Sequence, residues 1–96
     1  MITETQAMFT AQNVIGIETI TGNINIDFIE WHPENTDSTS TLEITDSFGN
    51  VLWKIITETV NPIDYSNTIL KQDLKKLSVR ELNITMSSGI LYIFKL

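Results

Sequence analysis

The chain has 96 residues, enough for one domain, and its twelve acidic and six basic residues give a net charge of −6. It contains no cysteine, which excludes disulfides and thiolate metal sites. The acidic balance disfavours a nucleic-acid partner, because binding to phosphates needs clustered Lys and Arg. The densest basic run, KQDLKKLSVR at 71–80, contains Asp73 and is better explained as a solvated strand face.

The apolar composition predicts an all-β fold. Fifteen Ile, four Val and thirteen Thr make a third of the chain β-branched, whereas Ala occurs only at positions 7 and 11. Branching at Cβ restricts χ1 in a helix and suits a pleated sheet. No apolar run approaches the roughly 20 residues that cross a bilayer, and the N-terminus lacks the pattern of a secretory signal. We therefore expect no membrane association.

Residues 1–12 are polar and without period, with Met8 and Phe9 isolated among them. We predict an extended N-terminal arm over 1–12 and a single domain over 13–96. The apolar pattern begins with VIGIETI (14–20) and continues, after a predicted turn at 21–23, with INIDFIEW (24–31).

The second of these runs changes parity. Ile24, Ile26 and Phe28 are predicted to share one face of a strand, but Ile29 and Trp31 then follow at odd positions. A one-residue slip moves every side chain to the other face of a sheet. The switch therefore predicts a bulge, a bend, or a strand end that is buried on both faces.

HPENTDSTS (32–40) has loop composition, and two amphipathic strands follow, TLEITD (41–46) and VLWKIIT (51–57). The connection between them, DSFGN, could begin a calcium loop or form a hairpin turn. Gly49 allows the positive φ of a tight turn, and Asp46 can bond the turn's own amides. Phe48 occupies a place where a calcium loop needs a ligand, and the next acid is Glu58. We predict a hairpin.

The remaining segments predict further strands. ETVNPIDYSNT (58–68) has no period and is expected to be a crossing segment. In ILKQDLKKLSV (69–79), Leu70, Leu74 and Leu77 are spaced for a helix, but irregular or extended structure is favoured. LNITM (82–86), a Ser-Ser-Gly turn ending at Gly89 and ILYIFKL (90–96) complete the chain. The pattern predicts a small antiparallel β-sandwich or barrel of six to seven strands.

The residues that could act in catalysis or bind a metal form no pattern typical of a catalytic, metal or cofactor site. His32 is the only histidine, so a zinc site lacks ligands, and no nucleophile motif surrounds it. Asp27 and Glu43 could face each other as paired carboxylates, but they belong to the polar faces of their strands and are better explained as solvated charges. No Gly-rich phosphate loop is present. We expect a protein that is not an enzyme and has no cofactor.

The aromatic residues divide into core and interface candidates. Trp53 is in phase with Val51 and Ile55, so it is predicted to lie in the core, where truncation to Ala should cost about 3–5 kcal/mol. Trp31, Phe48 and Tyr65 lie at strand ends or in loops. They could anchor an interface, stack on a sugar, or close the ends of the core. The candidate interface residues are Met8, Phe9, Trp31, Phe48 and Tyr65.

Three segments resemble a group of small structural proteins of tailed bacteriophages. They are IEWHPENTDSTSTLEITDSFGNVLWK, LSVRELNITM and SSGILYIFKL, which together make up 46 of the 96 residues. The shared pattern is a strand that ends in Trp, a polar loop, a T-L-x-I-x-D-x-x-G-N-x-L-W hairpin, and a closing S-G-x-L-Y-I-Y/F strand. The KQDLKKL stretch departs from this pattern, in which a turn and a shorter linker are expected, so 66–78 is the region that the resemblance describes least.

The resemblance implies a virion β-sandwich, in particular a capsid decoration (cement) protein on the outer head surface, made in the host cytoplasm. It implies that the partners are the major capsid protein or other virion proteins, with self-association into a homo-oligomer. The acidic charge agrees with an outer position, away from packaged DNA. The alternative is a carbohydrate-binding module or a component associated with a tail or fibre, because one fold serves many functions.

Overall fold

The computed structural model describes residues 1–33, 40–57 and 70–96, and these form one antiparallel sheet of seven strands in the order β1-β2-β7-β3-β6-β4-β5. The described residues contain no helix, so the predicted all-β class is confirmed. The predicted crossing segment 58–68 and most of the predicted loop at 32–40 lie outside the described residues. The strands are β1 Ile2–Glu4, β2 Met8–Gln12, β3 Glu18–His32, β4 Ser40–Thr45, β5 Val51–Thr57, β6 Leu70–Met86 and β7 Ile90–Lys95.

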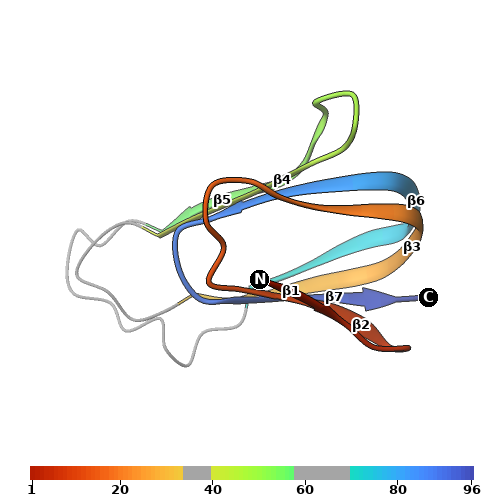
Figure 1. Cartoon of the computed structure of the whole chain (residues 1–96), viewed down its shortest axis with the longest axis horizontal. Coiled ribbons are helices and arrows are strands. Elements are labelled where there is room, and N and C mark those ends of the chain that lie inside the picture. Colours follow the sequence, from red (N-terminus) through yellow and green to blue (C-terminus); the bar gives the residue numbers. More distant parts are fainter. Residues whose placement is uncertain (34–39, 58–69) are drawn as a thin grey trace.

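The sheet folds over on itself because its two longest strands turn over at the same end of the molecule (Figure 1). The first part of β3 pairs with the last part of β6, as at Ile20 and Leu82, and β4 and β5 continue from there. The last part of β3 pairs with the first part of β6 on one side and with β7 on the other, followed by β2 and β1. The two halves of the sheet therefore face each other.

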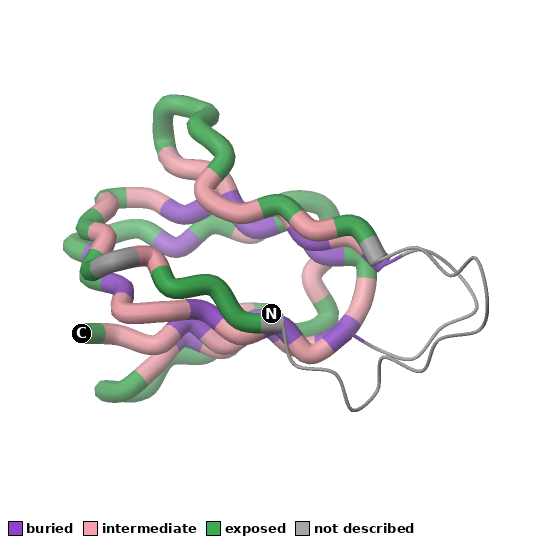
Figure 2. Tube along the Cα trace, turned by 180° about the vertical axis from the view of Figure 1, so that it is seen from behind, coloured by how far each residue is buried: buried purple, intermediate pink, exposed green. Residues whose placement is uncertain are grey.

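The core lies between these halves and consists mainly of branched aliphatic side chains. Removing this apolar surface from water is the dominant favourable term in folding. Buried residues recur on strands of both halves, as Figure 2 shows in purple. The buried members are Phe9, Ala11, Ile20, Ile24, Ile26, Ile29, Trp31, Leu42, Ile44, Leu82, Ile84, Met86, Leu91 and Ile93.

The turn predicted at 21–23 is wrong, because β3 runs through these residues without reversing. The pairing register with β6 shifts between Thr21 and Ile24, and Gly22 there has a φ of +129°. A glycine with positive φ is needed at many bulges as well as at tight turns, so its presence does not distinguish the two. The irregularity bends β3 instead of ending it.

The bulge predicted from the change of apolar alternation in β3 is confirmed. The register shifts between Ile26 and Phe28 against both β6 and β7. Ile26 and Ile29 are both buried, whereas Phe28 is only half-buried on the opposite face. The prediction that Phe28 shares a face with Ile26 is therefore wrong, since the extra residue at Asp27 reverses the alternation.

Of the 69–79 segment, the described residues 70–79 are extended, as favoured, because β6 begins at Leu70 and is continuous to Met86. Its helix-like leucine spacing has a local cause. Two residue steps in β3, from Ile26 to Phe28, face four steps in β6, from Leu77 to Asp73. The surplus residues form a bulge, where Lys76 has a φ of +60°. A bulge of this kind permits a spacing that regular alternation does not.

The prediction of a separate N-terminal arm is wrong, because residues 1–12 form a hairpin that belongs to the sheet. β1 pairs with β2, and β2 pairs with β7 along its whole length. Phe9 and Ala11 enter the core. The N-terminal amine lies 2.7 Å from the Glu18 carboxylate, which fastens the start of the hairpin to β3.

The hairpin predicted at 46–50 is confirmed. Asp46 Oδ1 accepts bonds from the amides of Phe48 and Asn50, each 2.9 Å long, and Asn50 Nδ2 donates to Oδ2 at 2.9 Å. Gly49 supplies the positive φ, +81°. The side-chain bond from Asn50, with help from the backbone amides, lowers the pKa of Asp46 below its ordinary value of 3.8. Both carboxylate oxygens thus serve the turn.

A second turn, at 87–89, closes one end of the core. Trp31 is fully buried, and its Nε1 donates to the carbonyl oxygen of Ser88 at 3.1 Å. The hydroxyls of Ser88 and Ser40 lie 2.9 Å apart, and the amide of Thr41 donates to Ser87 Oγ at 2.7 Å. This turn therefore joins the end of β3 to the start of β4 in the other half of the sheet.

Truncation of the two tryptophans should have unequal effects on stability. Trp53 packs against the core but is only partly buried, whereas Trp31 is completely buried. We expect Trp31→Ala to lower the free energy of unfolding by about 3–5 kcal/mol. Trp53→Ala should lower it by about 1–2 kcal/mol, because less of its surface leaves water on folding. Urea denaturation of the two variants measures both values, and an equal loss would contradict the assigned burial.

Two glycines with nearly the same backbone conformation should also respond differently to a methyl group. Gly49 and Gly89 have φ of +81° and +86°. A Cβ at Gly49 meets nothing within 4 Å, whereas one at Gly89 would lie 2.2 Å from the carbonyl oxygen of His32. Gly49→Ala should cost about 1–2 kcal/mol for the left-handed conformation. Gly89→Ala should cost about 1–3 kcal/mol more, for the overpacking. Thermal unfolding of both variants provides the comparison.

Candidate functional site

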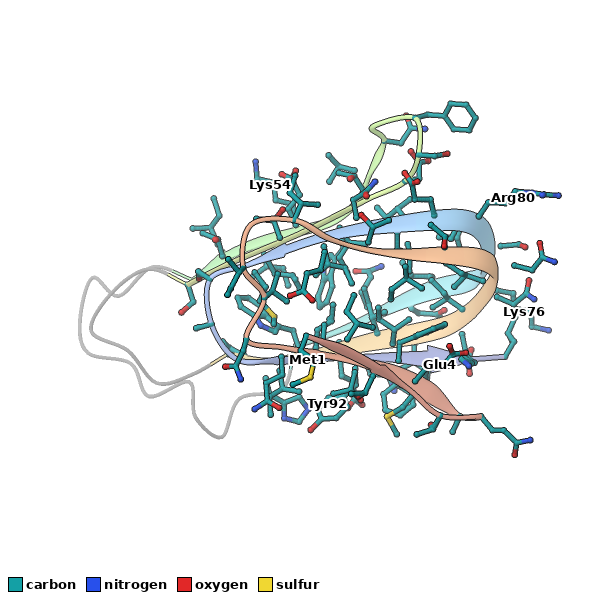
Figure 3. The ribbon with its side chains drawn as sticks, in the orientation of Figure 1. Met1, Glu4, Lys54, Lys76, Arg80 and Tyr92 are labelled. Carbon is teal, nitrogen blue, oxygen red and sulfur yellow. The ribbon has the colours of Figure 1, made fainter. Side chains whose placement is uncertain are left out.

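Four aromatic side chains gather on the outer face of β3 and β7, and we call them the aromatic face: Phe28, His32, Tyr92 and Phe94. The rings of Phe28 and Phe94 are stacked, with centroids 4.4 Å apart. Tyr92 lies 6.4 Å from Phe94 and meets His32 edge-on at 5.0 Å. Figure 3 shows Tyr92 pointing away from the other half of the sheet. The four rings form a continuous half-buried surface.

Strand alternation places these rings outside. On β7, Leu91 and Ile93 are fully buried, so Tyr92 and Phe94 between and beside them face outward. On β3, Ile29 and Trp31 are fully buried after the bulge, which leaves Phe28, Glu30 and His32 on the outer side. The pairing of Phe28 with Phe94, and of His32 with Ile90, brings the two strands into register.

Charged groups lie among and beside the rings of the aromatic face, on β3 and on the neighbouring strand β6. Lys71 Nζ lies 4.1 Å from the centroid of the Phe28 ring, a cation–π contact. Glu30 Oε2 lies 3.6 Å from His32 Nε2. That nitrogen is inaccessible and has no hydrogen-bond partner among the described residues. Aromatic side chains are enriched in protein–protein contact surfaces.

The sequence-predicted interface residues do not form one site. Phe9 is buried in the core, and Met8 is partly buried beside Phe94, to which it is paired on the outer face. Phe48 is 88% exposed at the tip of the β4–β5 hairpin. Tyr65 lies outside the described residues.

Trp31 requires a correction. An exposed anchor or a sugar-stacking face needs an accessible ring, but Trp31 is fully buried and bonded through Nε1 to Ser88. Its position is that of the alternative considered for it, the closing of one end of the core. The reason is the bulge at Asp27, which turns Trp31 inward together with Ile29.

The aromatic face was not predicted from the sequence. The sequence pattern places Phe28 on the same face as Ile26 and does not assign Tyr92 or Phe94 to a face. The sequence does contain an indication of this face. In ILYIFKL (90–96), alternate residues must point to opposite faces of the strand, so Tyr92 and Phe94 share one face and Leu91 and Ile93 the other. The sequence alone does not show which of these two faces is buried; in the structure, it is the face of Leu91 and Ile93.

The edge strand β5 offers a second exposed surface. It is the last strand in the sheet order, so among the described residues it pairs only with β4. Val51 and Ile56 are 56% and 53% exposed. Lys54, whose Nζ lies 3.4 Å from Glu43, is the one charge on the strand. An edge with apolar residues on both faces is a surface on which a further strand can pair.

The described residues contain no group of three or more His, Asp or Glu side chains able to hold a metal ion. Nor does any helix long and apolar enough to cross a membrane occur among them.

Comparison with protein-family models, with curated protein sequences and with solved structures found no match. The resemblance to phage structural proteins therefore depends only on the motifs quoted above.

Proposed function

We propose that this chain is a non-enzymatic structural protein that acts by binding other proteins, and that the aromatic face is its main contact surface. The observation that carries this proposal is the set of four neighbouring rings on the outer side of β3 and β7. Aromatic side chains are enriched at protein interfaces, where a few of them contribute most of the binding energy.

The more specific form of the proposal is a capsid decoration protein on the outer head surface of a tailed phage. It is supported by the T-L-x-I-x-D-x-x-G-N-x-L-W hairpin, which the chain forms at β4 and β5, and by the closing strand β7. The net charge of −6 favours a place outside the shell over contact with packaged DNA. The partner is then the major capsid protein or another virion protein.

Carbohydrate binding, in the virion or in an associated tail or fibre, is the second candidate. A sugar stacks on a free aromatic ring face, but the ring of Phe28 has contacts with Phe94 and with Lys71. The ring of Phe48 is accessible, since the residue is 88% exposed, and this exposure supports the second candidate. The aromatic face therefore supports a protein partner better than a glycan.

A charge placed on the aromatic face should weaken attachment to phage heads. We compare Tyr92→Lys with Thr85→Lys, which adds the same charge to an exposed position on the other half of the sheet. The probe is a preparation of heads from the phage that encodes this chain, with its gene deleted. Because anchor residues contribute about 2 kcal/mol or more, Tyr92→Lys should reduce affinity about thirtyfold in a co-sedimentation titration. Thr85→Lys should bind as the unmodified chain does.

Circular dichroism must first show that both variants fold. If heads bind the folded Tyr92→Lys variant normally, the aromatic face is not the contact surface. If heads do not bind the unmodified chain at all, the decoration role is wrong. A glycan array on which Phe48→Ala abolishes a specific signal would favour the second candidate instead.

We also propose that two copies associate through antiparallel pairing of their β5 strands. The exposed Val51 and Ile56 would then be covered, and the free backbone groups of both edges would be satisfied.

Light scattering at micromolar concentration should therefore give the mass of a dimer for the unmodified chain and of a monomer for Ile56→Lys, which places a charge on this edge. Thr3→Lys makes the same change on β1, at the opposite edge of the sheet, and should leave the dimer intact. A monomer before any substitution, or a dimer lost equally in both variants, would contradict pairing through β5.

A further inference from the structure

A cleft of about 570 Å³ lies between the β4–β5 hairpin and the bend of β6. This volume falls within the roughly 300–1,000 Å³ typical of ligand sites. The cleft is at the end where β3 and β6 turn over, and it shares no residue with the aromatic face. Its lining residues are Asn23, Asp46, Ser47, Phe48, Leu52, Leu77, Ser78, Val79 and Arg80.

One wall of the cleft is a strand with an open edge. Among the described residues, β4 pairs with β6 only from Asn83 to Met86. Residues 77–81 of β6 pair with β3 on their other side, and the hairpin leaves them uncovered on this one. An open edge presents backbone amides and carbonyls to which an extended peptide can pair as an added strand.

The cleft also has an apolar lining. Leu52, Leu77 and Val79 are partly buried there. Phe48 lies at the margin of the cleft with 88% of its surface exposed. Its backbone amide donates a hydrogen bond to Asp46 Oδ1, which fixes the backbone there. An apolar side chain of a bound peptide would cover these four residues, which are otherwise in contact with water.

Arg80 gives the cleft a group that can bind an anion. Arg80 and Lys76, both exposed, have no ion pair among the described residues, and Figure 3 shows them at the same end of the molecule. The Asp46 carboxylate also lines the cleft, but both of its oxygens are bonded within the turn. Guanidinium groups bind carboxylates in a fixed two-bond geometry.

We propose that this cleft binds an extended segment of a partner protein that carries an apolar side chain next to an acidic one. The segment pairs with the open edge of β6 at 77–81. Its apolar side chain packs on Leu52, Leu77 and Val79 beneath Phe48, and its carboxylate binds Arg80. This inference goes beyond the proposed function because it concerns a different surface and a partner of defined chemistry.

The test uses the ¹⁵N-labelled chain and two peptides, acetyl-Val-Leu-Asp-Val-amide and its counterpart with Asn in place of Asp. In an NMR titration to millimolar concentration, the acidic peptide should shift the amide signals of 77–81, Phe48 and Leu52. The Asn peptide should bind about threefold more weakly, as expected for one exposed ion pair. Arg80→Gln should remove the difference between the two peptides.

Matched variants separate the contributions of Arg80 and Phe48. Lys76→Gln removes a neighbouring exposed charge that does not line the cleft, and it should preserve the preference for the acidic peptide. Phe48→Ala should weaken both peptides about tenfold. Since Phe48 is 88% exposed, this variant should keep the spectrum of a folded chain.

N-methylation of the peptide tests strand pairing directly. Successive amides of a strand point to opposite sides, so of two peptides methylated at Leu or at Asp, only one should lose binding. Equal tolerance of both methyl groups would show that the peptide is not an added strand. Shifts confined to other residues, or no binding by the acidic peptide, would overturn the proposal, whether or not phage heads bind the aromatic face.

Discussion

Isoleucine-rich strand faces from the two halves of a single sheet are buried against each other, and this burial determines how the sheet is shaped. A flat sheet of this length could bury such a face only against another layer, and the described residues supply no second sheet. β3 and β6 must therefore turn over together, and both carry register shifts where they do so. The bend, the outer aromatic rings and the open edge beside the β4–β5 hairpin all follow from this folding.

The parts of the fold that local chemistry determines could be predicted from the sequence. The β4–β5 hairpin follows from Asp46 and Gly49, and the bulge in β3 from the change between Ile26 and Ile29. The places where prediction failed depend on contacts distant in sequence. Gly22 permits a turn or a bulge, and only pairing with β6 decides between them. The N-terminal hairpin has too few apolar residues to show a period, and it is stabilised by β7.

The candidate site was less predictable because a one-residue change of parity moves a side chain between core and surface. Trp31 and Phe28 are three residues apart, and the bulge exchanged their expected roles: the presumed anchor is buried, and the presumed core residue is part of the aromatic face. The sequence indicates that the apolar alternation of β3 changes near Asp27, but it does not indicate whether the residues before or after the change keep the expected orientation toward the core. That choice is made by Leu91 and Ile93 of β7, which fill the space beside Ile29.

The described surface presents different chemical groups in different places. Several charged groups are engaged in local contacts: Asp46 in its turn, Glu43 with Lys54, and the terminal amine with Glu18. Other accessible groups include the ring of Phe48, the apolar side chains of the edge strand β5 and the exposed bases at the bend of β6. In a chain of net charge −6, Lys76 and Arg80 place positive charge at the bend of β6, and Lys71 places one beside the aromatic face. The two surfaces therefore differ chiefly in their apolar groups, which are stacked rings on one and Leu52, Leu77 and Val79 near Phe48 on the other.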